Sequence, residues 1–307
     1  MFNLKRVNFI FLITILFASC NKDEDIIIND PEQPGYANSI FSVVEYLPAP
    51  GQFINDKASG LEKIYSMEQA CEMAQKRLDE NSFVSLGAWG GYITVKFKQS
   101  IYNKGSYDFS IAGNSFDSSN EPGIVWIMSD DNNNGLADDE WYELKGSYFN
   151  KEGYERNYWV EYYRPEKAGM DTRWTDSKGN TGIVEWVGTF HSQDFYYPEW
   201  VNASSYRLYG SLLPDKTLFD DETGQWKNLP YDWGYADNNG EDSQIVDING
   251  KTLQKNYFRI SDAVDKEGKQ INLKSIDFIR VQTAVNGKAS ILGENSTEIC
   301  GFFIENN

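Results

Sequence analysis

Residues 130–140 carry the side chains best suited to binding a hard cation. Oxygen-bearing side chains stand at alternate positions in this segment, and Gly135 stands at its sixth position. Alternate spacing turns the oxygens toward one point, and glycine permits the sharp bend that a short loop needs. Because the segment lacks His and Cys, Ca²⁺ fits best, and Mg²⁺ would need stricter geometry. The expected ligands are Asp130, Asn132, Asn134, Leu136, Asp138 and Glu140.

The spacing matches positions 1, 3, 5, 7 and 9 of an EF-hand loop, but the loop ends differently. Trp141 stands at the position of the final bidentate glutamate, and the carboxylates fall at Asp139 and Glu140. The flanking residues 123–128 and 141–149 show the pattern of strands rather than helices. We therefore expect a structural calcium ion between two strands, not a switch. An acidic, asparagine-rich hairpin loop without a metal is the alternative.

The elements that position this loop are expected to be strands. Most of the chain alternates with period two between turns rich in Gly, Asn and Asp, which predicts a mainly β protein, a β-sandwich of the jelly-roll type. The expected strands are 93–97, 107–111, 123–128, 141–145, 158–163, 182–186, 205–209, 276–283 and 298–304. Residues 213–250 are rich in Asp, Asn and Gly and are expected to form long loops.

One short helix is expected near the start of the domain, from about Ser66 to Asp79. Ser66 and Gln69 form a capping box, and an apolar face runs along the helix. Cys71 lies on that face and Cys300 in the last predicted strand. The sequence favours two buried, reduced thiols. A disulfide between them in an oxidising compartment is the alternative.

Residues 1–19 have the pattern of a lipoprotein signal peptide. Lys5 and Arg6 precede an apolar run, and small residues precede Cys20, which we expect to be lipidated. Residues 20–40 are expected to form a flexible tether, and residues 41–307 a single ligand-binding domain. Residues 21–25, in which Lys22 is followed by three acidic residues, resemble the surface-export signal of Bacteroidetes lipoproteins. That resemblance implies a lipid-anchored protein on the outer face of the outer membrane. A plain secretory signal and a solvated charge run are the alternatives.

The charge balance excludes some partners. The chain has 46 acidic and 28 basic residues, a net charge of −18, which argues against nucleic acid and against docking on anionic lipid. The sequence has no H-E-x-x-H, P-loop or G-x-S-x-G motif, so a non-enzymatic protein is favoured. A carboxylate pair of the glycoside hydrolase kind stays open. The 9 Trp, 19 Tyr and 18 Phe suit a β protein, and such rings also bind flat ligands and sugars.

Several segments spread from about residue 60 to the end carry a further signal. They are Val84–Phe97, Tyr107–Asn114, Glu121–Glu143, Tyr196–Trp200, Tyr231–Asp237, Ile276–Val281 and Gly293–Ile299. Together they resemble a family of surface-exposed cobalamin-binding lipoproteins of Bacteroidetes. Galactose-binding-type jelly rolls are also similar. The resemblance implies a corrinoid ligand and its delivery to an outer-membrane TonB-dependent transporter, alone or with other surface lipoproteins.

A corrinoid offers a cobalt ion, a flat apolar face and a fringe of amides. Aromatic walls with polar side chains around them would suit it. The expected site residues are Phe195, Tyr196, Tyr197 and Trp200 as one wall, Tyr231, Trp233 and Tyr235 as the second, Asp237 and Asn238 for polar groups, Trp89 at the rim, and His191, the only histidine, near the cobalt. Core packing is the alternative for each ring. A glycan-binding lipoprotein and a glycoside hydrolase are the alternative functions.

Overall fold

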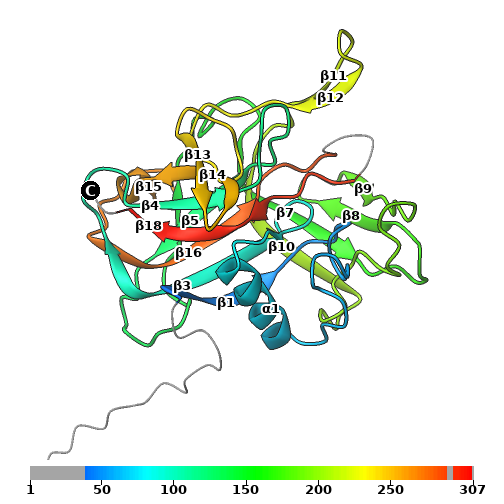
Figure 1. Ribbon diagram of the computed structural model, residues 1–307, viewed down its shortest axis with the longest axis horizontal. Coiled ribbons are helices and arrows are strands. Elements are labelled where there is room, and N and C mark those ends of the chain that lie inside the picture. The colour runs from blue at the N-terminus through cyan, green and yellow to red at the C-terminus, as the bar shows by residue number, and fades with distance from the viewer. Residues whose placement is uncertain (1–38, 289–292, 306–307) are drawn as a thin grey trace, which may run out of the picture. The chain divides into compact units, whose positions relative to one another are not determined.

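The computed structural model describes residues 39–288 and 293–305 (Figure 1). The predicted signal peptide, Cys20 and nearly all of the predicted tether lie outside these residues, so their roles stay predictions. Within the described part of the chain, no helix combines the length and apolar character needed to cross a bilayer.

The largest sheet is antiparallel and six-stranded, in the order β1-β3-β16-β5-β6-β15. Its strands are β1 (Phe41–Leu47), β3 (Tyr92–Tyr102), β16 (Ser275–Thr283), β5 (Gly123–Met128), β6 (Tyr142–Leu144) and β15 (Ala263–Val264). Successive side chains point to opposite faces of a strand. In β16, Ile279 and Val281 therefore enter the core, while Arg280 and Gln282 face the other side of the sheet.

A four-stranded sheet in the order β13-β14-β4-β18 packs against the core face of the first. Its strands are β13 (Ser243–Ile248), β14 (Lys251–Phe258), β4 (Phe109–Gly113) and β18 (Gly301–Ile304). Phe109 and Phe302 meet Val95 and Ile279 in one buried cluster. Two sheets that enclose a common apolar core form a β-sandwich, which confirms the predicted fold class.

A second four-stranded sheet, in the order β10-β7-β8-β9, covers a separate core (Figure 1). Its strands are β10 (Ser205–Leu212), β7 (Glu155–Tyr163), β8 (Thr172–Asp176) and β9 (Thr181–Val184). Tyr158, Tyr162 and Leu208 pack there against Trp89. The remaining elements are the pair β2 (Val84–Ser85) and β17 (Glu298–Ile299), the hairpin β11 (Thr217–Asp220) and β12 (Gln225–Asn228), and the 3-10 turn η1 (Ile260–Asp262).

The α-helix of the described residues, α1, spans Met67–Asp79, close to the predicted bounds. The Ser66 hydroxyl accepts the Gln69 N–H at 3.1 Å, which caps the helix. The Gln69 side chain accepts the N–H of Tyr65 at 2.9 Å, one residue before the position of an ideal capping box. Ala70, Ala74 and Leu78 bury the apolar face of α1 in the sandwich core.

Two details of the predicted organisation concern the loops and the thiols. Residues 213–250, expected to be long loops, contain β11, β12 and β13. That prediction was wrong, because backbone pairing forms these hairpins in spite of the polar composition.

Cys71 is half-buried and Cys300 is buried, and both are unpaired. Burial raises the pKa of each thiol to about 12.

Candidate functional site

A cavity of about 430 Å³ lies where the outer face of the six-stranded sheet meets strands β7 and β10. We call it the inter-sheet pocket. Side chains alternate between the two faces of a strand, and this explains the aromatic lining. Trp126 stands between Val125 and Ile127, whose side chains occupy the core, so its own side chain faces the pocket. The pocket is lined by Tyr92, Trp126, Trp141, Arg156, Asn157, Trp159, Tyr209, Gly210, Ser211, Lys266, Arg280 and Gln282. Its size falls within the usual range for small-molecule sites.

Positive charge gathers at this pocket although the whole chain is acidic. Among the described residues, the charged groups that line it are Arg156, Lys266 and Arg280. The Arg280 guanidinium carbon lies 4.4 Å from the ring centre of Tyr92 and 4.3 Å from that of Trp141. Nη2 of Arg280 also contacts Glu45 at 2.5 Å, which fixes the side chain. Rings and guanidinium groups together suit a flat ligand that carries carbonyl or phosphate oxygens.

Gln282 forms a buried polar wall of the inter-sheet pocket. Its Nε2 donates to the carbonyl oxygens of Gly90 and Tyr209, each at 2.8 Å. No donor among the described residues reaches its Oε1, although the residue is only 3% exposed. A Cβ on Gly210 would lie 1.9 Å from that oxygen, so glycine is needed there. The Gln282 oxygen is therefore a buried acceptor without a donor in the wall of the pocket.

The base of the pocket is held by a buried carboxylate. Glu143 accepts the hydroxyls of Ser211 and Tyr154, each at 2.6 Å. Its Oε2 lies 3.8 Å from Nε of Arg156. Burial raises the pKa of Glu143, and these hydrogen bonds and the arginine oppose that rise. This network ties β6, β7 and β10 together beneath the aromatic rings.

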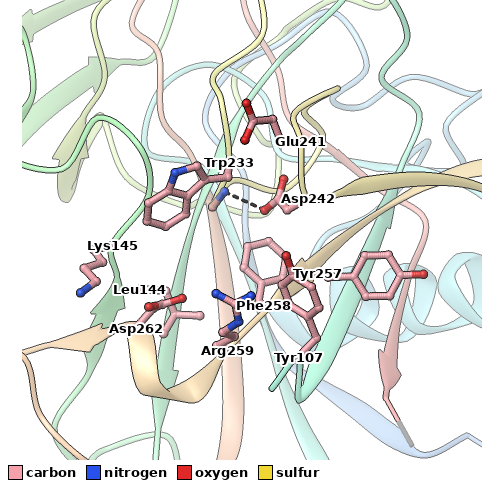
Figure 2. Close-up of a pocket in the computed structure, with 11 residues that line it drawn as sticks. Tyr107, Leu144, Lys145, Trp233, Glu241, Asp242, Tyr257, Phe258, Arg259 and Asp262 are labelled. Carbon is pink, nitrogen blue, oxygen red and sulfur yellow. Dashed lines mark hydrogen bonds between the residues drawn. The ribbon is translucent and has the colours of Figure 1, made fainter. Parts of the chain in front are cut away.

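A second cavity, of about 290 Å³, is shown in Figure 2 and is called the Trp233 pocket. It is lined by Tyr107, Leu144, Lys145, Trp233, Gly234, Glu241, Asp242, Tyr257, Phe258, Arg259 and Asp262. Trp233 is 36% exposed. The Arg259 guanidinium carbon lies 4.5 Å from the ring centre of Tyr107. The pocket thus combines aromatic surface with both positively and negatively charged side chains.

Asp242 is the buried polar group of the Trp233 pocket. Its Oδ2 accepts the N–H of Gly234 at 2.7 Å, the dashed line in Figure 2. Its Oδ1 receives no donor from the described residues. Burial raises the pKa of Asp242 to about 6. A ligand that donates a hydrogen bond, such as a sugar hydroxyl, would satisfy this oxygen.

The first predicted aromatic wall lies mainly in the core. Tyr196 and Tyr197 are buried under the β7–β10 sheet, and Trp200 joins the sandwich core. The Tyr196 hydroxyl donates to the carbonyl of His191 and the Tyr197 hydroxyl to that of Ala203, each at 3.0 Å. Phe195 is half-buried. A ligand could reach the three buried rings only by displacing the chain around them.

The residues of the second predicted wall are also split between the core and a pocket. Tyr231 and Tyr235 are buried together with ring centres 5.2 Å apart, whereas Trp233 faces its own pocket. Asn238 is fully buried and exchanges hydrogen bonds with the backbone of Tyr231, 2.8 Å each way. Asp237 is buried as well and accepts backbone N–H groups. The structure therefore does not bring the two predicted walls together around one cavity.

The two remaining predicted site residues lie apart from both pockets. The His191 ring packs against Phe53 at 4.8 Å between ring centres, and its Nδ1 lies 3.9 Å from Asp56 Oδ1. Trp89 is fully buried with its ring edge-on to Tyr158 at 4.7 Å. Neither is a lining residue of the inter-sheet pocket or of the Trp233 pocket.

The predicted calcium loop follows β5 and folds into a closed turn. Asp130 accepts the N–H groups of Asn134 at 3.1 Å and Gly135 at 2.9 Å. The Asn134 side-chain amide lies 3.0 Å from Asp138. Gly135 has φ +77°, a left-handed conformation that suits glycine. The oxygen-bearing side chains Asp130, Asn132, Asn134 and Asp138 thus converge, and this donor set fits Ca²⁺.

The far end of the loop differs from the predicted ligand set. Asp139 turns inward, where its Oδ2 accepts the N–H of Asp131 at 3.0 Å and its Oδ1 accepts the Asn132 side-chain amide at 3.2 Å. Glu140 is exposed and instead accepts the Tyr142 hydroxyl at 3.1 Å. Asp139 therefore faces into the loop, whereas the predicted ligand Glu140 faces away from it. Leu136 is 59% exposed and its N–H donates to Asn134, and a leucine at this position can offer an ion only its backbone carbonyl oxygen.

The chain matches no protein-family profile and no curated protein sequence.

The rings of the inter-sheet pocket were not predicted from the sequence, although a signal for them exists. Trp126 and Trp159 stand at single outward positions of strands whose neighbouring residues are buried. Contiguous aromatic runs such as residues 195–197 led to the prediction instead, and Tyr196 and Tyr197 of that run fill the core.

Proposed function

We propose that this protein is a non-enzymatic, lipid-anchored surface protein that binds a corrinoid in the inter-sheet pocket and passes it to an outer-membrane TonB-dependent transporter. The observation that carries the proposal is the lining of that pocket: Trp126, Trp141, Trp159, Tyr92 and Tyr209 surround one cavity together with Arg156, Lys266 and Arg280. The motif resemblance named above supports the corrinoid as ligand.

The chemistry of the ligand matches this lining. Aromatic rings suit the flat apolar corrin face, and arginine suits amide carbonyl and phosphate oxygens. The buried oxygen of Gln282 suits an amide N–H of the ligand fringe. A pocket of about 430 Å³ is smaller than a whole corrinoid and would leave part of the ligand outside. An exposed part of the ligand is what a transporter needs for handover.

In this proposal the cobalt has no bond to His191, because that histidine lies against Phe53 and Asp56. A calcium ion held by Asp130, Asn132, Asn134, Asp138 and Asp139 would brace the end of β5, the strand that carries Trp126. Calcium would then act on ligand binding only through the position of that strand.

Titration of the protein with cyanocobalamin, followed by absorbance or calorimetry, tests the proposal. The variants Trp126→Ala and Trp159→Ala should weaken binding, and Trp226→Ala is the matched control. Trp226 is a 42% exposed tryptophan on the separate β11–β12 hairpin. Absence of cyanocobalamin binding by the wild-type protein, or equal affinities for all variants, contradicts the proposal.

Glycan binding in the Trp233 pocket is the second candidate function. The exposed Trp233 ring beside the unpartnered Asp242 oxygen favours it, because sugars stack on tryptophan and donate hydroxyls to carboxylates. A glycan array with the wild-type protein and Trp233→Ala separates the two functions. Glycan binding that Trp233→Ala removes, without cyanocobalamin binding, favours this candidate. Cleavage of a bound glycan would instead indicate a glycoside hydrolase.

A further inference from the structure

Three carboxyl groups that are far apart in the sequence meet near the start of β5. Glu121, Asp237 and Glu298 each place an oxygen within 4.8 Å of the other two. Glu121 lies just before β5, Asp237 follows the bridge between Ala236 and Gly123, and Glu298 begins β17. Asp237 is 1% and Glu298 3% exposed, and Glu121 is half-buried. We call these residues the carboxylate triad.

Backbone amides hold the triad oxygens in place. Ser296 N–H donates to Glu121 Oε1 at 2.9 Å, and Glu298 N–H donates to Asp237 Oδ2 at 2.9 Å. The N–H of Ser115 reaches Asp237 Oδ1 at 2.8 Å. Asp237 has φ +52°, a left-handed conformation that aspartate adopts more readily than most residues other than glycine and asparagine.

The triad lacks a balancing positive charge from the protein. In the described residues, none of the three carboxylates forms an ion pair with lysine or arginine within 4.0 Å. Buried like charges at this spacing need neutralisation by protons or by a cation.

The carboxyl groups of Glu121 and Glu298 contact each other, which either a shared proton or a bridging cation would allow. Unused acceptors favour the cation. No donor among the described residues reaches Glu298 Oε1. Asn295, three residues before Glu298 in the sequence, is 2% exposed, and its Oδ1 is also without a donor among the described residues. Every unpartnered side-chain atom on residues 294–298 is an oxygen acceptor. An excess of buried acceptors with fixed positions is what a metal ion satisfies, since a carboxylate oxygen can use its lone pair on the ion.

We propose that Glu121, Asp237 and Glu298 bind a divalent cation that prefers oxygen ligands, with Ca²⁺ the best match, at a site separate from the loop at residues 130–140. The ligands are carboxylates without His or Cys, which disfavours zinc and the softer transition metals. The ion would join three segments, the lead into β5, the turn at residue 237 and the start of β17. It would act as an internal tie rather than as part of a ligand pocket.

Calorimetry with CaCl₂ on the full-length protein tests this site after chelator treatment. Asp130→Asn combined with Asp138→Asn first silences the exposed loop. We expect this protein to retain a single calcium ion per chain. Adding Glu298→Gln or Asp237→Asn should lower the remaining affinity by about a hundredfold or more, as loss of a buried charged ligand does. Glu294→Gln is the matched control: it alters a buried neighbouring acid outside the triad and should leave the ion bound.

The opposite results identify protons as the neutralising charge. In that case the loop-silenced protein binds no calcium at millimolar concentration, and Glu298→Gln raises the melting temperature in chelator without changing the calcium content. Either result overturns the proposal. Should Glu298→Gln fail to fold by circular dichroism, Glu121→Gln at the half-exposed position replaces it. Full calcium binding by that folded variant overturns the proposal as well.

Discussion

Tyr209 on β10 is the direct cross-strand partner of Trp159 on β7, and both line the inter-sheet pocket. Adjacent rings on one face of a sheet form a continuous apolar surface. We expect Trp159→Ala to weaken cyanocobalamin binding by about tenfold, since an aromatic contact contributes about 1 kcal/mol beyond its buried area. Tyr209→Ala should have a similar effect, measured by absorbance titration. Trp226→Ala should bind as the wild type does, and a deficit in that control would point to a general loss of folding.

Gly210 sets the shape of the same pocket. We expect Gly210→Ala to displace the Gln282 amide, because the new Cβ would lie 1.9 Å from its oxygen. The lost hydrogen bonds to Gly90 and Tyr209 should lower the free energy of unfolding by about 2 kcal/mol. Urea unfolding measures this loss, and cyanocobalamin titration should show weaker binding. Unchanged stability would mean that the Gln282 side chain has room to move.

Stability should fall as the pH rises in the presence of a chelator. Burial raises the pKa of Glu294 from 4.5 to about 7, so the folded protein holds a proton that the unfolded chain has lost. Between these values the folded state binds more protons, and each unit of rise lowers the free energy of unfolding by about 1.4 kcal/mol. Asp242, with its pKa raised to about 6, adds to the same trend. Thermal melts from pH 4.5 to 7.5 measure it.

Glu294→Gln is the variant that tests this pH dependence. This variant should lose less free energy of unfolding as the pH rises. At the highest pH the difference from the wild-type protein should be about 3 kcal/mol, the most that this single group can contribute. A melting temperature that rises with pH in the wild-type protein would contradict the prediction.

Calcium at the loop of residues 130–140 should stabilise the fold without being essential to it. At a concentration ten times the dissociation constant, a bound ion adds about 1.4 kcal/mol. Asp130→Ala should remove this increment and lower the melting temperature. Asp139→Asn should weaken the calcium effect more than Glu140→Gln, because only Asp139 faces the loop. Equal effects of the last two variants would restore Glu140 as a ligand.

Cys71 and Cys300 should stay reduced and unreactive in the folded protein. Burial raises both pKa values to about 12, so almost no thiolate is present at pH 8. Iodoacetamide followed by peptide mass spectrometry should label both residues only after denaturation. A peptide linked through these residues in the unreduced protein would establish the disulfide alternative.

The parts of the fold that were predictable are those in which local pattern and packing agree. Residues 123–128 were predicted as a strand from their apolar run, and β5 has these bounds. The helix was predicted from its cap and its apolar face, and it begins one residue later. The polar interval 213–250 gave no such signal, because the strands β11 to β13 pair through backbone groups and bury few side chains.

The candidate site was harder to predict because its members come from five strands and two loops. Tyr92, Trp126 and Arg280 meet through the register of β3, β5 and β16, which a single sequence does not determine. The predicted residue Asp237 illustrates the same limit. Its neighbours Glu121 and Glu298 are 116 and 61 residues away, so the carboxylate triad follows from topology and not from spacing.

Strand β5 has Glu121 just before it, Trp126 within it and Asp130 shortly after it. A cation at either end would restrict the same strand that supplies an aromatic ring to the inter-sheet pocket. If the ions tighten ligand binding, thermodynamic linkage requires the ligand to tighten ion binding by the same factor. If the proposed ligand and surface location hold as well, the calcium concentration outside the cell would set how readily the protein releases that ligand, and a fall in calcium would favour release.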